Sequence, residues 1–307
     1  APVITSGATA SVAENTTAVM TVTATDSDQP AQTLSFSIVG GADAAKFAIN
    51  SSTGALSFLA APDFETPTDA GGDNVYDVTI QVSDGQGSTD SQAIAVTVTS
   101  ANDNAPVITS GSTASVAENT TAVMTVTATD ADQPAQTLSY SIIGGADAAK
   151  FAINSSTGAL SFVSAPDFES PTDAGGDNVY DVTVQVSDGQ GSTDSQAIAV
   201  TVTSANDNAP VITSGTTASV AENTTAVMTV TATDADQPAQ SLSFSIVGGA
   251  DAAKFTINAN TGALSFLAAP DFETPTDAGG DNVYDVTVEV ADGQGSTDSQ
   301  AIAVTVT

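Results

Sequence analysis

Several residue types are missing from this chain, and each absence removes a class of site. The sequence has no cysteine, histidine or tryptophan, and its only basic residues are three lysines among 307 residues. Without cysteine, neither a disulfide nor a thiolate metal site can form. Without histidine, a Ser-His-Asp triad and the usual zinc sites are impossible. The missing cysteines do not by themselves define the compartment.

Positive charge is almost absent as well. The chain carries 36 carboxylates and has a net charge of -33 at pH 7. This charge excludes nucleic acid and anionic membrane surfaces as partners on electrostatic grounds. The sequence also lacks a signal-like N-terminus and an apolar run near 18 residues. We therefore expect no direct membrane insertion of this segment, and expect export signals or anchors to lie outside it.

The sequence is dominated by a long internal repeat. The string APVITSG begins at Ala1, Ala105 and Ala209, a spacing of 104 residues, and the first two copies differ at only eight positions. A unit of about 100 residues is large enough to form its own core. The sequence predicts three domains in a row, residues 1–104, 105–208 and 209–307. The third copy stops before its linker, so we expect the chain to be a segment of a longer array.

Within each copy the apolar residues alternate with polar ones. In repeat 1 this period of two covers Met20–Ala24, Leu34–Ile38, Tyr76–Val82 and Ile94–Val98, with shorter candidate strands between them. Half-buried strands show this alternation, and Gly- and Asp-rich turns separate them here. The pattern predicts an all-β chain of three tandem seven-stranded antiparallel Greek-key β-sandwiches, immunoglobulin-like in type, arranged in a rod.

The aromatic residues fit inside this pattern. Phe36, Phe47, Phe58 and Tyr76 fall on inward-facing positions, and Phe64 is expected to anchor a loop to the core. Tyr76 is expected to brace the start of its strand, as tyrosine corners do. No aromatic stripe remains for stacking on sugars, which weakens a carbohydrate-binding interpretation.

Acidic residues gather at strand ends and in loops, which a sandwich collects at its two poles. Glu14 lies in VAEN, Asp26 and Asp28 form a D-x-D, and Asp63 and Glu65 lie in PDFE. A further acid ends the Tyr76–Val82 strand at Asp84, and the linker between the first two copies reads Asn-Asp-Asn-Ala-Pro, with its acid at Asp103.

These motifs, in this order, resemble the cadherin family, and the resemblance covers all 307 residues in triplicate. PDFE stands where cadherins have an LDRE-like motif, and the linker resembles their NDNxP. The composition, rich in Thr, Ala, Val, Asp and Gly without Cys, most resembles cadherin-like repeats of large secreted bacterial adhesins, including those of the RTX-type export route.

The resemblance implies Ca²⁺ bound between successive repeats. At the first junction the implied ligands are Glu14, Asp63, Glu65, Asn102, Asp103, Asn104, Asp130, Asp132 and Asp188. At the second they are Glu118, Asp167, Glu169, Asn206, Asp207, Asn208, Asp234, Asp236 and Asp292. Seven carboxylates without a basic residue would repel by about 3 kcal/mol per close pair. Hard oxygen ligands suit Ca²⁺, and two or three ions per junction would nearly cancel the repulsion.

Two departures from the family pattern bear on the ion number. The first acid of the family linker is replaced by Ser100 and Ser204, which favours two ions as an alternative to three. The insertion Thr66–Asn74 contains Asp69 and Asp73, which would form either a polar turn or a further ion site. Each terminal pole has only part of a junction, so we expect weak occupancy there.

The sequence therefore predicts a calcium-stiffened extender of an extracellular, bacterial cell-surface adhesin, whose first partners are the neighbouring repeats of its own chain. The alternative is a binding module in its own right, which grips other cadherin-like domains or a polysaccharide. An enzyme is not expected: the Asp26/Asp28 pair has metal-ligand spacing, and no insertion would form a cleft.

Overall fold

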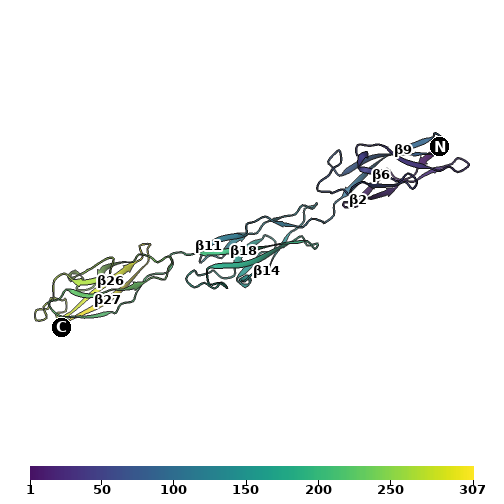
Figure 1. Ribbon diagram of the computed structural model, residues 1–307. Coiled ribbons are helices and arrows are strands. Elements are labelled where there is room, and N and C mark those ends of the chain that lie inside the picture. The colour runs from purple at the N-terminus through teal and green to yellow at the C-terminus, as the bar shows by residue number, and fades with distance from the viewer.

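The alternation of apolar and polar residues forms nine short strand segments in the first repeat of the computed structural model, which describes residues 1–307. The other two repeats have the same arrangement. The three domains lie end to end, with the two termini at opposite ends of the molecule (Figure 1).

The strands of repeat 1 are β1 (Pro2–Ile4), β2 (Thr9–Ala13), β3 (Ala18–Thr21), β4 (Ala24–Asp26), β5 (Ser35–Gly40), β6 (Phe47–Ile49), β7 (Ala55–Phe58), β8 (Val75–Ser83) and β9 (Thr89–Thr99). Those of repeat 2 are β10 (Val107–Ile108), β11 (Thr113–Ala117), β12 (Ala122–Thr125), β13 (Ala128–Thr129), β14 (Ser139–Gly144), β15 (Phe151–Ile153), β16 (Ala159–Phe162), β17 (Val179–Ser187) and β18 (Thr193–Thr203). Those of repeat 3 are β19 (Val211–Ile212), β20 (Thr217–Val220), β21 (Ala226–Thr229), β22 (Ala232–Thr233), β23 (Ser243–Gly248), β24 (Phe255–Ile257), β25 (Ala263–Phe266), β26 (Val283–Ala291) and β27 (Thr297–Val306). One short 3₁₀ turn precedes the sixth strand of each repeat: η1 (Ala44–Lys46), η2 (Ala148–Lys150) and η3 (Ala252–Lys254).

Two sheets face each other in each domain. In repeat 1 they have the orders β2-β9-β8-β5 and β3-β7-β6, and β1 pairs with β4 beside them. Since β1 leads into β2 and β3 into β4, the nine segments follow seven strand paths, and the predicted sandwich is confirmed.

The first strand path differs from the prediction in one respect. Residues Thr9–Ala13 form β2, which runs parallel to β9, with Thr9 opposite Ala95. The alternation did not predict this strand because Val12 is its only buried apolar residue. All other pairs in the repeat are antiparallel.

The core of each domain lies between these two sheets. In repeat 1, Val78, Ile80, Val82 and Val96 of β8 and β9 are at most 1% exposed. The predicted inward aromatics are buried as well: the rings of Phe47 and Phe58 stack at 4.5 Å, and Tyr76 packs edge-on against Phe58 at 5.1 Å. Equivalent aromatic trios occur in the other two repeats.

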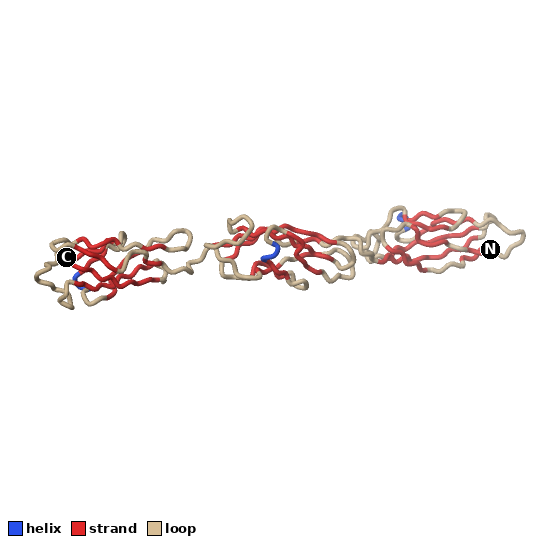
Figure 2. The backbone as a smooth tube through the Cα atoms, turned by 90° about the horizontal axis from the view of Figure 1, so that it is seen from below, coloured by secondary structure: helices blue, strands red, loops and turns tan.

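Two glycines per repeat, Gly41 and Gly54 in repeat 1, are required by close packing of the backbone. Gly54 has a φ of +71°, and an added Cβ would lie 2.1 Å from the carbonyl oxygen of Val22. Its own carbonyl accepts a hydrogen bond from the Val22 backbone N–H at 2.8 Å. The strands run along the long axis of each domain, so the loops gather at its two ends (Figure 2). This arrangement brings loops that are distant in sequence to the junctions between domains.

Candidate calcium-binding junctions

The pole of repeat 1 that faces repeat 2 is built from the residue after β2 and the loop after β7. Glu14 is 3% exposed, and its carboxylate is fixed by two backbone N–H groups, that of Phe64 at 2.7 Å and that of Ala101 at 2.6 Å. Asp63 accepts a hydrogen bond from the Thr66 backbone at 3.0 Å. Carboxylate oxygens of Glu14, Asp63 and Glu65 lie within 4.8 Å of one another.

Glu65 is the least satisfied member of this group. Both of its carboxylate oxygens are buried without a hydrogen-bond partner. Burial raises the pKa of Glu65 above its ordinary value, and the neighbouring charge of Glu14 raises it further. The side chain therefore sits where a negative charge is expensive unless a cation shares the site.

The facing pole of repeat 2 is built from the residues after β13 and β17. Asp132 is 1% exposed. One carboxylate oxygen of Asp130 accepts a hydrogen bond from the Asp132 backbone N–H at 3.1 Å, and the other oxygen of Asp130 is buried without a partner. Asp188 accepts backbone N–H groups of the turn that follows, among them Gln190 at 2.8 Å. The Asn102 side chain and then this turn lower the pKa of Asp188, which keeps it ionised.

The linker bonds to both repeats. The Asn104 backbone and side-chain amides donate to one oxygen of Asp132 at 3.1 and 2.8 Å, and the Asn102 amide donates to Asp188 at 2.9 Å. Burial opposes the ionisation of Asp132, but the hydrogen bonds from Asn104 outweigh it and lower its pKa. On the other side, Asp103 accepts a hydrogen bond from the side chain of Asn15.

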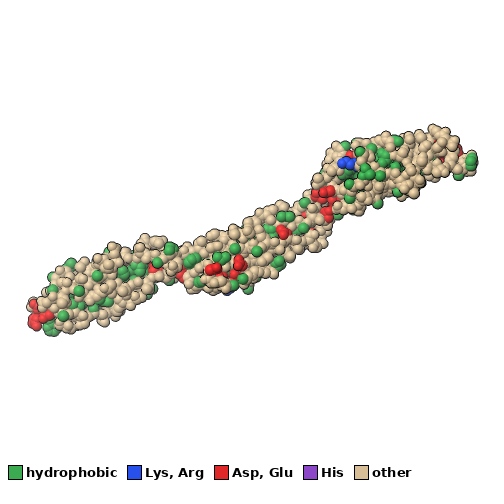
Figure 3. Space-filling model, in the orientation of Figure 1, with side chains coloured by type: hydrophobic (Ala, Val, Ile, Leu, Met, Phe, Trp, Pro, Cys, Tyr) green, Lys and Arg blue, Asp and Glu red, His purple; other side chains and the backbone are tan.

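The central group of the junction contains one carboxylate from each of its three parts. Oxygens of Glu65 in repeat 1, Asp103 in the linker and Asp132 in repeat 2 lie within 4.8 Å of one another. At that separation each pair repels by about 3 kcal/mol at an effective dielectric of about 20. The acidic side chains are visible at the narrow neck between repeats 1 and 2 (Figure 3).

The second junction has the same construction. Glu169, Asp207 and Asp236 form its central group, and Glu118, Asp167 and Glu169 form the group on repeat 2. Asn208 donates twice to Asp236, and Asn206 donates to Asp292 at 3.1 Å. Asp234 places a buried oxygen without a partner beside them, as Asp130 does at the first junction. A direct contact between repeats also occurs here, from the Gln237 backbone N–H to Glu169 at 3.2 Å.

Fourteen of the eighteen sequence-predicted residues lie in these acid groups or are hydrogen-bonded to their members, and the pairs Asn102–Asp188 and Asn206–Asp292 are linked to them through glutamine side chains. The structure also adds residues that the sequence did not single out. Gln136 donates to Asn102 and, at 3.1 Å, to Asp132, and Gln240 repeats both bonds at the second junction. Their loop carries no motif, so only the recurrence of glutamine could have drawn attention to them. Asn15, with a φ of +60°, lies inside VAEN, where only the glutamate drew attention.

The insertion that contains Asp69 behaves as a turn. One oxygen of Asp69 accepts the Asp73 backbone N–H at 3.0 Å and the other accepts that of Asn74 at 3.1 Å. Burial would raise the pKa of Asp69, but these hydrogen bonds lower it. Asp73 in turn accepts the Val75 backbone N–H at 3.2 Å. Of the two alternatives, this geometry favours the polar turn.

The residues present fit a hard divalent cation. Unpartnered carboxylate oxygens converge with carboxylates of two repeats and the linker, and no lysine takes part in an ion pair anywhere in the structure. Oxygen-only sites of this kind suit Ca²⁺. At the first junction the ligand atoms would come from Glu65, Asp103, Asp130 and Asp132, with Glu14 and Asp63 beside them.

Comparison with known proteins gives the family. The cadherin-domain family model matches residues 8–99, 112–203 and 216–307, and the chain belongs to the cadherin family. It is 32% identical over 291 residues to human Protocadherin Fat 1, covering 90% of this chain and 6% of that protein. It is 34% identical over 272 residues to mouse Protocadherin Fat 4, covering 84% of this chain and 5% of the relative. The chain thus spans a small fraction of these curated relatives.

Solved structures share the fold. Mouse Cadherin-23 EC22-24 superposes with a TM-score of 0.69 at 24% identity, covering 97% of this chain and 95% of that one. A cis-dimer structure of Protocadherin gammaB7 EC3-6 gives a TM-score of 0.68 at 23% identity, covering 99% and 73%. Cadherin domains are adhesion modules that bind Ca²⁺ where repeats meet, and the acidic groups of this chain lie at those positions. No helix here is long and apolar enough to cross a bilayer.

Proposed function

We propose that this chain is a calcium-stiffened extender of an extracellular adhesin, which holds a ligand-binding region away from the cell surface. One observation carries the proposal: Glu65, Asp103 and Asp132 come from a repeat, a linker and the next repeat, yet their oxygens lie within 4.8 Å of one another. An ion held by all three would have to lose ligands before the two domains could bend apart. The units of the stalk would be residues 1–104, 105–208 and 209–307.

The eighteen residues of the two junctions would hold the ions: Glu14, Asp63, Glu65, Asn102, Asp103, Asn104, Asp130, Asp132, Asp188, Glu118, Asp167, Glu169, Asn206, Asp207, Asn208, Asp234, Asp236 and Asp292. Each junction would take two or three Ca²⁺, because Ser100 and Ser204 stand where a further acid would favour the third. Metal analysis after gel filtration in calcium would count the ions directly. A result of no ions at the junctions would remove the basis of the proposal.

Chelation tests the mechanical consequence. Removing Ca²⁺ leaves the close carboxylates unbalanced, so the linkers should flex and the domains lose a ligand that binds only the folded state. Small-angle scattering should show a shorter maximum dimension with chelator, and the unfolding temperature should fall by several degrees. Asp103→Ala should loosen the first junction only. An unchanged scattering curve and melting temperature after chelation would contradict the function.

We assign the parent molecule to the secreted adhesins of bacteria, of the RTX-exported type, on composition. Support comes from the lack of cysteine, the low number of basic residues and the near-identity of the copies.

A second candidate is adhesion by the repeats themselves, through pairing with other cadherin-like domains or with a polysaccharide. The structure of Protocadherin gammaB7 EC3-6, which has the same fold, is a cis-dimer. This supports pairing with other cadherin-like domains rather than with a polysaccharide. Analytical ultracentrifugation with and without calcium would detect such pairing. A chain that stays monomeric at high concentration in calcium would leave the extender as the function.

A further inference from the structure

Each repeat has one pair of parallel strands, and this pair joins the N-terminal part of the repeat to its last strand. In repeat 2, β11 runs parallel to β18, with Thr113 opposite Ala199 and Ala117 opposite Thr203. The other strand pairs of the repeat are antiparallel. The pairs β2–β9 and β20–β27 are the equivalents in repeats 1 and 3. We call this pair the terminal ladder.

The terminal ladder lies in the path of any tension along the rod. The domains lie end to end, and their strands follow the long axis (Figure 1, Figure 2). Because β11 and β18 are parallel, the start of β11 and the end of β18 lie at opposite ends of the ladder. A pull along the rod therefore shears the two strands, and their evenly spaced hydrogen bonds carry the load together. In an antiparallel pair both chain ends would lie at one end, and the bonds would break one after another.

Hydrogen bonds, rather than packing, hold β11 in place. Its only buried apolar side chain is Val116, which is 8% exposed, whereas β18 buries Ile198, Val200 and Val202 at 1% or less. The preceding strand, β10, pairs with β13 at only two positions, so it offers little resistance to tension. We therefore expect detachment of β11 from β18 to limit the unfolding of the repeat under load.

Glu118 closes the ladder at the end that faces repeat 3. Its backbone N–H donates to the carbonyl oxygen of Thr203 at 3.0 Å, and its carboxylate accepts the backbone N–H of Ala205 at 2.6 Å. The Thr203 hydroxyl donates in turn to the carbonyl oxygen of Val116 at 3.2 Å. The end of β11 is thus bonded both to the end of β18 and to the linker through which repeat 3 would pull.

We propose that the terminal ladder is a mechanical clamp, which sets the tension at which a repeat unfolds, and that Glu118 closes this clamp where the load enters. The inference rests on the proposed extender function, because only a stalk under tension would use it. It concerns unfolding within a repeat, whereas the junction resists bending between repeats. The closing bond recurs in repeat 1, where the Glu14 backbone N–H donates to Thr99 at 3.0 Å. Forced unfolding is governed by the unfolding rate, so interactions broken before the transition state decide the outcome.

The test pulls the whole 307-residue chain by its two ends at constant calcium, one molecule at a time, and should show three unfolding events. Val116→Ala removes two buried methyl groups from β11, so one of the three events should have an unfolding rate raised by about tenfold. Val126→Ala is the matched control, because Val126 is 1% exposed in the same core but lies outside both strands of the ladder. It should lower the melting temperature at least as much, yet change the rate under load by less than about twofold.

Thr203→Val gives a second test that keeps the size of the side chain. It removes only the hydroxyl bond to Val116, and should raise the rate of one event by about fivefold. Equal acceleration by Val116→Ala and Val126→Ala, or an unchanged rate in Thr203→Val, would overturn the proposal. Scattering in calcium and chelator tests the extender separately. A stiff chain without the predicted differences would refute the clamp alone, and a clamp in a chain that calcium does not stiffen would refute the extender.

Discussion

The C-terminal pole of repeat 2 lies against repeat 3, whereas the corresponding pole of repeat 3 has no neighbour, and this difference shows what a junction contributes. Glu118 and Phe168 of repeat 2 face repeat 3; the glutamate is 3% exposed and the phenylalanine packs against the core. Their counterparts Glu222 and Phe272 lie at a pole without a neighbour, where Phe272 is 46% exposed.

The opposite pole shows the same contrast. The Asp28 side chain at the free pole of repeat 1 is 49% exposed, whereas Asp132 and Asp236 at the junctions are each 1% exposed. The three aspartates belong to the same D-x-D motif. Burial of the second aspartate of this motif therefore depends on the junction, whereas Asp84 is 4% exposed even at the free pole. Burial of a carboxylate without a counter-charge disfavours its ionised form.

The sharpest way to break this comparison is to neutralise one acid at each kind of pole. Glu169→Gln removes a carboxylate from the central group of the second junction, where close charges interact by about 3 kcal/mol per pair. We expect calcium to bind that junction at least tenfold more weakly, measured by calorimetry. Glu273→Gln is the matched control at the free pole and should change junction binding less than twofold. Equal losses of calcium affinity in both variants would mean that each pole binds calcium without a contribution from the neighbouring repeat.

The next effect concerns packing. Phe168→Ala removes a ring that contacts the core of repeat 2, and about 1–2 kcal/mol of unfolding free energy should be lost, since full burial of a phenylalanine is worth about 1.5–3 kcal/mol. Phe272→Ala, at the exposed counterpart, should cost less than about 1 kcal/mol. Thermal unfolding of the two variants in calcium measures both. A larger loss from Phe272→Ala would show that exposure does not distinguish the two poles.

A smaller effect is expected from the amides that fasten the linker. Gln240→Met removes hydrogen bonds to Asn206 at 2.7 Å and Asp236 at 3.1 Å, so the second junction should loosen by about 1 kcal/mol. The matched variant Gln32→Met alters the same position at the free pole and should leave the junctions unchanged. Hydrogen exchange of the linker amides reports the difference. If the linker amides exchanged faster in both variants, the hydrogen bonds of Gln240 would not be the cause of the loosening.

The smallest effect is that of mild acid. The pKa of Glu169 is raised by burial and then by the charge of Glu118, so its protonated form contributes stability below its ordinary pKa of 4.5 that is lost as pH rises through the higher folded value. In chelator, acidification toward pH 5 should therefore relieve repulsion at the junction. In calcium the same protons compete with the ion, and affinity should fall modestly over that range.

Asp236 titrates in the opposite sense. Burial opposes its ionisation, but hydrogen bonds from Asn208 outweigh it and lower its pKa, so its contribution is present above the ordinary value of 3.8 and is lost as pH falls through the lower folded value. Carboxyl NMR titration without calcium should show Glu169 protonating well before Asp236. The reverse order would contradict the geometry of the junction.

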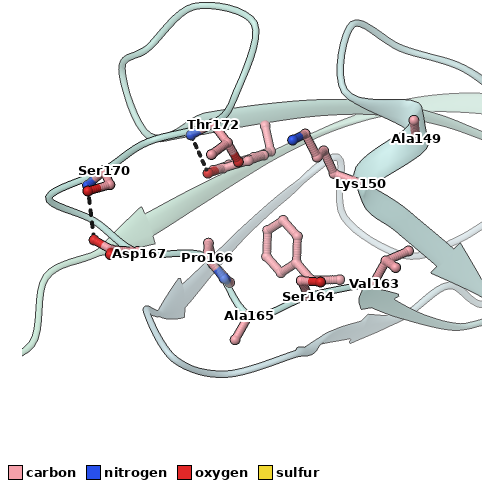
Figure 4. Close-up of a pocket in the computed structure, with 11 residues that line it drawn as sticks. Ala149, Lys150, Val163, Ser164, Ala165, Pro166, Asp167, Ser170 and Thr172 are labelled. Carbon is pink, nitrogen blue, oxygen red and sulfur yellow. Dashed lines mark hydrogen bonds between the residues drawn. The ribbon is translucent and has the colours of Figure 1, made fainter.

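Much of this protein is determined by its sequence alone. The alternation in Tyr76–Val82 and Ile94–Val98 predicts half-buried strands, and the acids at the strand ends predict a cation site where the loops of neighbouring repeats meet. Tertiary structure decided what depends on segments distant in sequence. A single buried Val12 does not predict a strand, because the strand forms by pairing with the distant β9. Gln136 binds Asn102 and Asp132 only because the fold brings its loop to the linker. Lys150 lines a pocket because the loop after β16 packs against η2 (Figure 4). Local patterns record which faces are buried, whereas the neighbours across a junction are set by the packing of whole domains.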